Sequence, residues 1–219
     1  MFTERADGGT LSVMRINMAG EFGLVLSTRR AGEAARHSIE RAIASLNPGQ
    51  PVCLDFRRVS AITVPFADEC VGQLLSSHLS GYYEDHPLLV ANANDDVRET
   101  LAAALRQRNL AVLSVSNGSG AELLGGDDLL SRTVEAAYEI GEPFGAAEIA
   151  DRLNVTPQAA NNRLKALLRS GALSRVRIVP ERGGKEFLYT LPLPSQRSKR
   201  QPSRSGDGRS RRRRPRQPA

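Results

Sequence analysis

The stretch AAEIADRLNVTPQAANNRLKALLRSGALSRVRI, residues 146–178, decides the fold of the C-terminal half of the chain. Ile149 and Leu153 are four positions apart and predict an amphipathic helix over 146–153. Thr156 and Pro157 are typical of a helix start, because the hydroxyl accepts from a free backbone N–H and proline suits the first helical position. A helix over 157–170 is predicted next, with an inward face made of Ala160, Leu164, Leu167 and Leu168.

The flanking residues extend this stretch to a pattern of three helices and two strands. Another helix is predicted over 129–141, where Leu130, Val134, Ala137 and Tyr138 form one apolar stripe. Gly171 is expected to end the last helix in a left-handed conformation. Two strands should follow, one marked by Leu173, Val176 and Ile178, the other by Phe187, Tyr189 and Leu191, with Pro180 to Lys185 as the loop between them.

This pattern resembles the winged helix-turn-helix domains of bacterial transcription regulators, and residues 147–153, 155–157 and 162–173 carry the resemblance. The resemblance implies that the helix over 157–170 enters the major groove of double-stranded DNA, while the loop between the strands touches the backbone. Asparagine and glutamine can pair bidentately with adenine, whereas lysine and arginine suit phosphates. The candidate base contacts are Gln158, Asn161 and Asn162, and the candidate cationic contacts are Lys165, Arg169, Arg182 and Lys185.

Other roles fit the same pattern. Winged helices also serve as dimerisation and protein-docking modules, and a polar helix face can simply be solvated. Between Asp127 and Glu186, nine acidic residues balance nine basic ones, so this segment alone is expected to attract DNA only modestly. A homodimer is compatible with the resemblance, although no segment stands out as a dimerisation helix.

The basic charge of the chain is concentrated in residues 195–219, which hold ten lysine or arginine residues against one acid, Asp207. Since the whole chain carries +6, the preceding 194 residues carry −3. A segment with so little apolar surface is expected to be disordered and to add salt-sensitive attraction to phosphates. A solubilising role, or attraction to an acidic protein or a membrane surface, is the alternative. The excess of arginine over lysine in the chain, 27 to 3, is also what a codon bias would produce.

The first half of the chain alternates between strand and helix patterns, which predicts one small α/β domain. A hairpin is expected from 11–17 and 22–27, turned at Ala19 and Gly20. The expected helices span 31–46, 66–79 and 94–108, the last with Asn94 as its cap. The expected sheet strands span 52–56, 88–93, 110–116 and 121–124.

The most distinctive residues of this half are Asp55-Phe56 followed by Phe66-Ala67-Asp68-Glu69, with support from Phe22, Ser27, Arg29, Arg30, Ala34, Leu54 and Val59. With these residues, this half resembles a bacterial family of STAS-like domains of unknown function. The resemblance implies the fold of anti-anti-sigma factors, which bind kinase-type ATPase partners and are switched by phosphorylation of a serine at the start of the second helix. The candidate partner-binding residues are Arg29, Arg30, Asp55, Phe66, Asp68 and Glu69.

One position departs from that family. Pro65 stands where members often have the serine, and proline has no hydroxyl to phosphorylate. Thr63 and Ser60 lie nearby in the sequence and are substitute acceptors, although hydroxyls are common in loops. A protein or ligand contact is therefore the expected trigger if this domain switches.

Catalysis has one candidate, the carboxylates Asp55, Asp68 and Glu69, which could serve metal binding or acid–base work. Acids in the first turn of a helix are favoured by the helix dipole in any case, so a structural role is expected for Asp68 and Glu69. Arg29 and Arg30 would either pair with these acids or receive an anionic ligand. His37, His78 and His86 lack metal-ligand spacing, Cys53 and Cys70 are expected to be buried, and no phosphate-binding loop is present.

These observations predict an α/β STAS-like domain over 1–126, a small α+β winged helix-turn-helix domain over 127–194 and a disordered basic tail over 195–219. The predicted function is that of a bacterial transcription regulator that contacts DNA, without enzymatic activity or cofactor. The alternative is a partner-switching protein whose winged helix docks on another protein. Without a signal peptide or membrane span in the sequence, a cytoplasmic location is expected. Gly125 to Asp128 would join the domains too tightly for free tumbling.

Overall fold

The computed structural model describes residues 13–80, 86–116, 120–141, 143–178 and 186–192. Its centre is a five-stranded sheet in the order β1-β3-β5-β6-β7, in which the first four strands are parallel and β7 is antiparallel to β6. Every residue of β3 and β5 is buried, which is typical of parallel strands covered on both faces. The strands are β1 (Met14–Asn17), β3 (Val52–Asp55), β5 (Leu88–Ala91), β6 (Val112–Ser116) and β7 (Gly120–Leu124).

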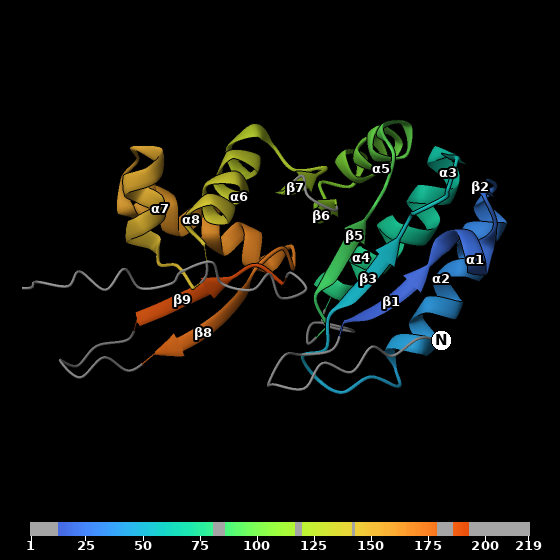
Figure 1. The fold of residues 1–219 in the computed structure, drawn as a ribbon, viewed down its shortest axis with the longest axis horizontal. Helices are drawn as coiled ribbons and strands as arrows, with labels where there is room; N and C mark the ends of the chain where they lie inside the picture. The colour runs from blue at the N-terminus through green and yellow to red at the C-terminus, as the bar shows by residue number, and fades with distance from the viewer. Residues whose placement is uncertain (1–12, 81–85, 117–119, 142, 179–185, 193–219) are drawn as a thin grey trace, which may run out of the picture.

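Helices cover one face of this sheet (Figure 1). They are α2 (Arg29–Ile43), the nearly continuous run of α3 (Val64–Ala67), η1 (Asp68–Gly72) and α4 (Gln73–Leu79), and α5 (Asp95–Gln107). Leu54, Val90 and Val112 point from the sheet into an apolar core that also contains Phe66 and Leu101. The segment η1 is a turn of π-helix, so the helix predicted over 66–79 is present with an irregularity that its sequence did not indicate.

The hairpin predicted from 11–17 and 22–27 is wrong. Asn17 ends β1 and caps a short helix, α1 (Met18–Phe22), because its side chain accepts a hydrogen bond from the Gly20 N–H at 3.0 Å. Within the described residues, β1 pairs with β3, and β2 (Val25–Leu26) pairs in parallel with β4 (Ala61–Ile62) in a separate small sheet. Both pairings join segments distant in sequence, which local patterns do not reveal.

The C-terminal elements lie close to their predicted bounds. They are α6 (Asp128–Ile140), α7 (Ala146–Leu153), α8 (Pro157–Arg169) and the antiparallel pair β8 (Ser174–Ile178) and β9 (Glu186–Thr190). Phe144 forms an isolated bridge to Tyr189, through backbone hydrogen bonds of 2.8 and 3.1 Å. The predicted caps are present: Asn94 accepts from the Val97 N–H, Thr156 accepts from the Ala159 N–H, and Gly171 has φ 75°.

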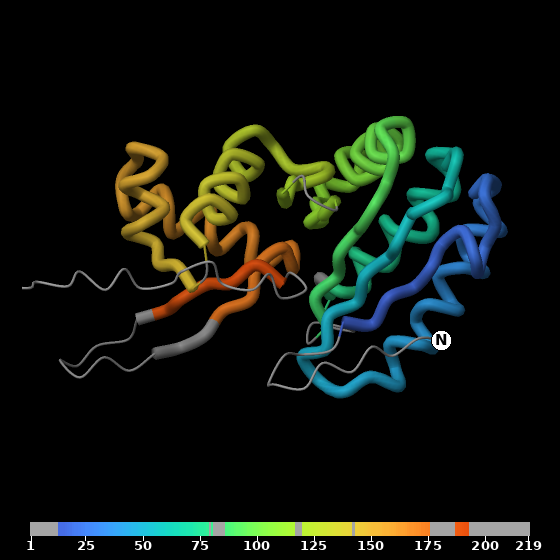
Figure 2. Tube along the Cα trace, viewed as in Figure 1, coloured from blue at the N-terminus to red at the C-terminus, as the bar shows by residue number. Residues whose placement is uncertain are grey.

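The C-terminal elements cover the second face of the sheet (Figure 2). Cys53, Leu89 and Leu113 point to this side and belong to the same apolar cluster as Val134, Phe144, Leu164 and Leu167. A methyl group at Gly171 would lie 2.6 Å from the His78 ring, so the end of α8 also lies against α4. Within the described residues, the sheet is thus buried between two helical layers, and the second layer comes from beyond residue 127.

Two features complete the description of the fold. Cys53 and Cys70 are buried and free, as expected, and they lie in different apolar clusters, Cys70 on the α2 side of the sheet and Cys53 on the other. Within the described ranges, no helix is both long enough and apolar enough to span a membrane.

Candidate functional site

Helix α8 presents a polar face to solvent. Gln158, Asn162, Lys165 and Arg169 are exposed, and Asn161 is half-buried. Ala160, Leu164 and Leu167 are fully buried on the opposite side and anchor the helix in the core. The amide of Gln158 donates to the Asn162 side chain at 3.2 Å, so these two predicted base contacts emerge side by side.

Local sequence fixes where α8 begins. Asn154 ends α7 in the left-handed conformation, with φ 50°, which asparagine tolerates better than most residues. Thr156 then caps α8 and Pro157 occupies its first turn. An ion pair between Arg152 and Glu139 joins α7 to α6. The orientation of α8 relative to α7 is therefore set by a short connection with defined caps at both ends.

The charge of α8 is uniformly basic. Its thirteen residues contain Arg163, Lys165 and Arg169 and no acid. The sequence interpretation did not single out Arg163, which is half-buried, or Arg175 on β8, whose guanidinium lies 4.4 Å from the centre of the Phe187 ring. The predicted phosphate contacts Arg182 and Lys185, and residues 195–219, lie outside the described residues.

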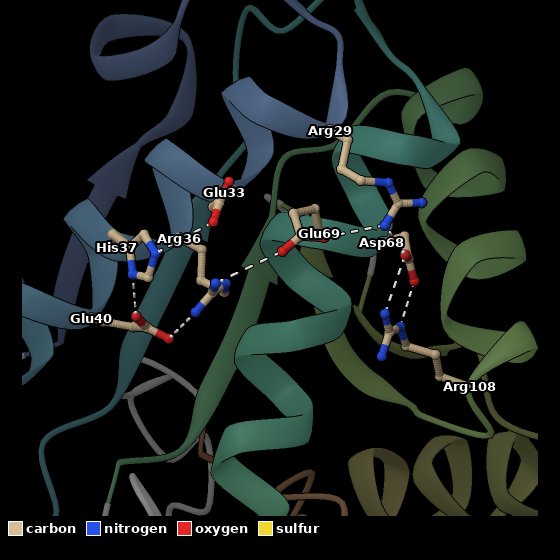
Figure 3. A network of polar contacts seen from close by, with 8 residues as sticks. All are labelled: Arg29, Glu33, Arg36, His37, Glu40, Asp68, Glu69 and Arg108. Atoms are coloured by element: carbon tan, nitrogen blue, oxygen red, sulfur yellow. Dashed lines mark hydrogen bonds and ion pairs between the residues drawn. The ribbon is translucent and has the colours of Figure 1, made fainter.

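A second group of predicted residues lies in a network of ion pairs where α2 meets α3 and η1 (Figure 3). Arg29 contacts both Asp68 and Glu69 at 3.2 Å, and Arg108, the residue that caps the end of α5, binds Asp68. Arg36 lies 3.7 Å from Glu69 and 2.8 Å from Glu40. Gly32 allows this close packing, because a methyl group there would lie 2.9 Å from the Phe66 carbonyl oxygen.

The network stabilises the charged form of Asp68. Hydrogen bonds from Arg108, and secondarily from Arg29, lower the pKa of Asp68 despite the opposing effect of burial. The predicted pairing of Arg29 with Asp68 and Glu69 is present, so this network ties helices together. Arg30 is exposed and makes no ion pair with any described residue.

Phe66 is buried, whereas a residue that contacts a binding partner must be accessible at the surface. Its side chain is 1 % exposed and belongs to the core between the sheet and the helices. A binding partner cannot touch it unless the fold opens. The prediction that Phe66 contacts a partner directly is therefore wrong for the folded chain, because the aromatic ring supplies core volume.

Asp55 belongs to a separate set of contacts at the carboxyl end of β3. Its carboxylate accepts from Asn92 Nδ2 at 2.9 Å, from the Arg57 N–H at 3.0 Å and from Arg15 Nη1 at 2.9 Å. Burial acts to raise the pKa of Asp55, but these hydrogen bonds outweigh it and lower the pKa. Arg15 and Asn92 were not predicted as partners of Asp55, because the order of the strands that brings them together is not visible in the sequence. Arg57, two residues along the chain, was not singled out either.

The three carboxylates considered for catalysis do not form one cluster. Asp55 is bound by Arg15, Arg57 and Asn92, whereas Asp68 and Glu69 are bound by arginines of α2 and by Arg108 at the end of α5. Among the described residues, no three histidine, cysteine, aspartate or glutamate side chains are placed to hold a metal ion. The interpretation of Asp55, Asp68 and Glu69 as a joint metal site is therefore wrong.

The two hydroxyls near Pro65 differ in their surroundings. Ser60 donates to the Leu24 carbonyl at 2.9 Å, while Thr63 is exposed at the start of α3 and makes no side-chain capping bond. Pro65 lies in the first turn of α3, where its missing N–H costs nothing. Of the two substitute acceptors, only Thr63 presents an unengaged hydroxyl.

Comparison with known proteins identifies a domain family for one segment of the chain. A family model described as a STAS-like domain of unknown function matches residues 31–98, from the first turn of α2 into the first turn of α5. This segment is therefore STAS-like, as its resemblance implied, and it is called the STAS-like part below. It includes Asp55, Phe66, Asp68 and Glu69. No curated protein and no solved structure matches the chain.

Proposed function

We propose that the protein is a transcription regulator that binds double-stranded DNA through α8, with the STAS-like part as its partner-binding module. The single observation that carries this proposal is the composition of α8, which exposes amide and cationic side chains, contains no acid and is anchored by a fully buried apolar face. Amides suit adenine edges and cations suit phosphates, so one helix offers both kinds of contact that DNA recognition needs.

The surroundings of α8 support the proposal. Three helices are followed by an antiparallel strand pair, the layout of the winged helices that the C-terminal sequence resembles. In such domains the last helix enters the major groove with its N-terminal residues towards the bases. Gln158, Asn161 and Asn162 lie in the first half of α8, and Lys165 and Arg169 in the second half.

The test is selection of DNA fragments from the whole genome by the full chain, at near-physiological salt. A chain ending at Pro194 is compared in the same experiment. A motif shared by both establishes base recognition and assigns residues 195–219 to affinity. Binding that disappears with those residues, with no shared motif, rejects base recognition by α8.

Single substitutions then separate base contacts from phosphate contacts. Gln158→Ala and Asn162→Ala should each relax the preference at one base position by about 1–3 kcal/mol. Lys165→Ala should weaken binding to all sequences alike and reduce the salt dependence. Arg106→Ala, which removes an exposed cation from α5, is the matched control and should change neither quantity. Equal losses from the amide and lysine variants would argue against base contacts.

A second function, docking of a kinase-type ATPase beside the STAS-like part, is favoured by one surface. Leu24 and Val25 are 52 % and 59 % exposed, although both are large apolar side chains. Val25 belongs to β2 of the small β2–β4 sheet and Leu24 directly precedes it. The Thr63 N–H donates to the Leu26 carbonyl, which brings the exposed Thr63 beside them. Exposed apolar side chains beside a free hydroxyl suit a protein contact that phosphorylation could switch.

This second function has its own variants. Val25→Asp should abolish a pull-down with a kinase-type ATPase of the same organism, and Arg29→Ala should weaken it. Leu129→Asp is the matched control, since Leu129 is an exposed leucine, 52 % accessible, on α6. DNA affinity should remain unchanged in all three variants. A pull-down that survives Val25→Asp, or that fails equally with Leu129→Asp, rejects this docking surface.

A further inference from the structure

An open pocket with a volume of about 670 Å³ adjoins β1, which is the edge strand of the sheet within the described residues. Asn17 and Asp55, the last residues of β1 and β3, line it, so it lies at the carboxyl end of two neighbouring parallel strands. Open α/β sheets bind ligands at this end, and the volume is within the usual range for small molecules. Neither the ion-pair network of Asp68 nor α8 contributes to its lining.

The lining is rich in arginine. Arg15, Arg57 and Arg58 line the pocket together with two acids, Asp55 and Glu21. Asp55 is engaged by Arg15 at 2.9 Å. Arg57 and Arg58 are exposed, and neither guanidinium forms an ion pair with a carboxylate of the described residues. Two adjacent arginines without a carboxylate partner among the described residues therefore line the same pocket.

The loop that carries these two arginines is held in an unfavourable conformation. The Val59 N–H donates to the Phe56 carbonyl at 2.9 Å, which makes Phe56 to Val59 a tight turn with Arg57 and Arg58 at its centre. Arg58 has φ 71°, the value of the third residue of a type II turn, where glycine is strongly favoured. Asp55 fixes the turn from the other side by accepting from the Arg57 N–H. Such strained residues are concentrated at binding sites.

The rest of the pocket is apolar. Met14, Phe22 and Ala42 are half-buried in its wall, and the buried Ile16 and Ile39 also line it. A ligand that filled this space would need an apolar portion against β1, α1 and α2. It would also need an oxyanion group, because guanidinium groups bind carboxylates and phosphates through paired hydrogen bonds.

We propose that this pocket binds a small organic anion, with its carboxylate or phosphate on Arg57 and Arg58 and its apolar part against Met14 and Phe22. The proposal does not depend on DNA binding, because the pocket and α8 share no residue. It assigns to the STAS-like part a ligand site beside its protein-docking surface.

The experiment is calorimetric titration of the full chain with hexyl phosphate, without DNA. Hexanoate tests the carboxylate form of the same chemistry, and hexanol and inorganic phosphate test the apolar part and the anion separately. Hexyl phosphate or hexanoate should bind at least about tenfold more tightly than hexanol and inorganic phosphate, because a charged hydrogen bond and apolar burial both contribute. No saturable binding of either organic anion would overturn the proposal.

Two variants test the assignment of the arginines. Arg57→Gln and Arg58→Gly should each weaken binding by about tenfold, and Arg106→Gln should leave it unchanged. Arg58→Gly is the sharper variant, because glycine accepts the left-handed conformation and the protein should melt at the same or a higher temperature. A variant that is at least as stable yet loses the ligand supports the site. Unchanged affinity in both variants overturns it.

Discussion

The STAS-like part and α8 use their charged residues in opposite ways. In the STAS-like part, Asp68 and Glu69 receive two arginines each, and Asp55 is enclosed by three hydrogen-bond donors. On α8, Lys165 and Arg169 are exposed and no acid stands on the same helix to pair with them. Charge at the first place holds elements of the fold together, whereas charge at the second is available to another molecule. A list of charged residues does not distinguish these cases.

The two regions nevertheless share an apolar core. Leu89 and Leu113 of the sheet and Leu164 and Leu167 of α8 belong to the same buried cluster. Although the two regions use charge differently, they do not have separate hydrophobic cores. A change on one side of this cluster should be felt on the other.

The largest effect is expected inside the STAS-like part. Phe66→Ala should lower the free energy of unfolding by about 3–5 kcal/mol, because it removes a fully buried ring and leaves a cavity. Urea unfolding followed by circular dichroism measures the loss. Leu24→Ala, at an exposed position, is the control and should cost less than about 0.5 kcal/mol. Similar losses in the two variants would contradict the assignment of Phe66 to the core.

The shared core gives the next test. Leu113→Ala should cost about 2–5 kcal/mol, since the side chain is fully buried between the sheet and the C-terminal helices. Hydrogen exchange measured by mass spectrometry should show the same loss of protection in peptides from β5 and from α8. If only the sheet peptides lose protection, the two regions unfold separately and the comparison becomes one of independent domains.

The ion-pair network should contribute less. Asp68→Asn should cost about 1–2 kcal/mol at neutral pH, because it removes the charged partner of Arg29 and Arg108 at a partly buried site. The pKa of Asp68 is lowered in the folded state, so its stabilisation is complete above the unfolded value of 3.8 and is lost as the pH falls through the folded value. The difference between wild type and variant should therefore shrink below pH 3.8.

Denaturant unfolding at a series of pH values measures this difference. Asp151→Asn, at an exposed position on α7, is the control and should change stability by less than about 0.5 kcal/mol. A loss for Asp68→Asn that stays constant from neutral to acidic pH would show that the charge of Asp68 is not what stabilises the fold.

The smallest effect on stability is expected on α8. Asn162→Ala and Lys165→Ala should each change the free energy of unfolding by less than about 0.5 kcal/mol, because both side chains are exposed. Thermal melting measures this, and each variant's loss of DNA affinity is then read against an unchanged fold. A clear fall in stability for either variant would mean that this face is part of the fold rather than a binding face.

The sequence predicted the C-terminal elements almost to the residue because their boundaries are marked locally. Thr156, Pro157 and Gly171 each act on the neighbouring backbone, and the apolar spacing of α7 and α8 follows the helical repeat. The N-terminal hairpin failed for the opposite reason. The partner of β1 is β3, some forty residues away, and the pairing of β2 with β4 spans a similar distance.

The candidate sites divide in the same way. The exposed face of α8 followed from its periodicity, whereas the surroundings of Asp55 did not, since Arg15 and Asn92 reach it from two other strands or strand ends. Phe66 was assigned to partner binding through the family resemblance, and its depth in the core depends on how α3 packs on the sheet. Local sequence spacing therefore predicted which residues of α8 are exposed. The burial of Phe66 and the partners of Asp55 depend on the tertiary packing, which local spacing does not reveal.

The two buried cysteines can serve as native probes of the order in which the two sides of the sheet unfold. Burial raises the pKa of Cys53 to about 11 and that of Cys70 to about 12, so at neutral pH both thiols are protonated and shielded from alkylating reagents. They lie on opposite sides of the sheet, Cys53 facing the C-terminal elements and Cys70 facing α2. Pulsed alkylation therefore records, from two native atoms and without any introduced probe, which side of the sheet opens first.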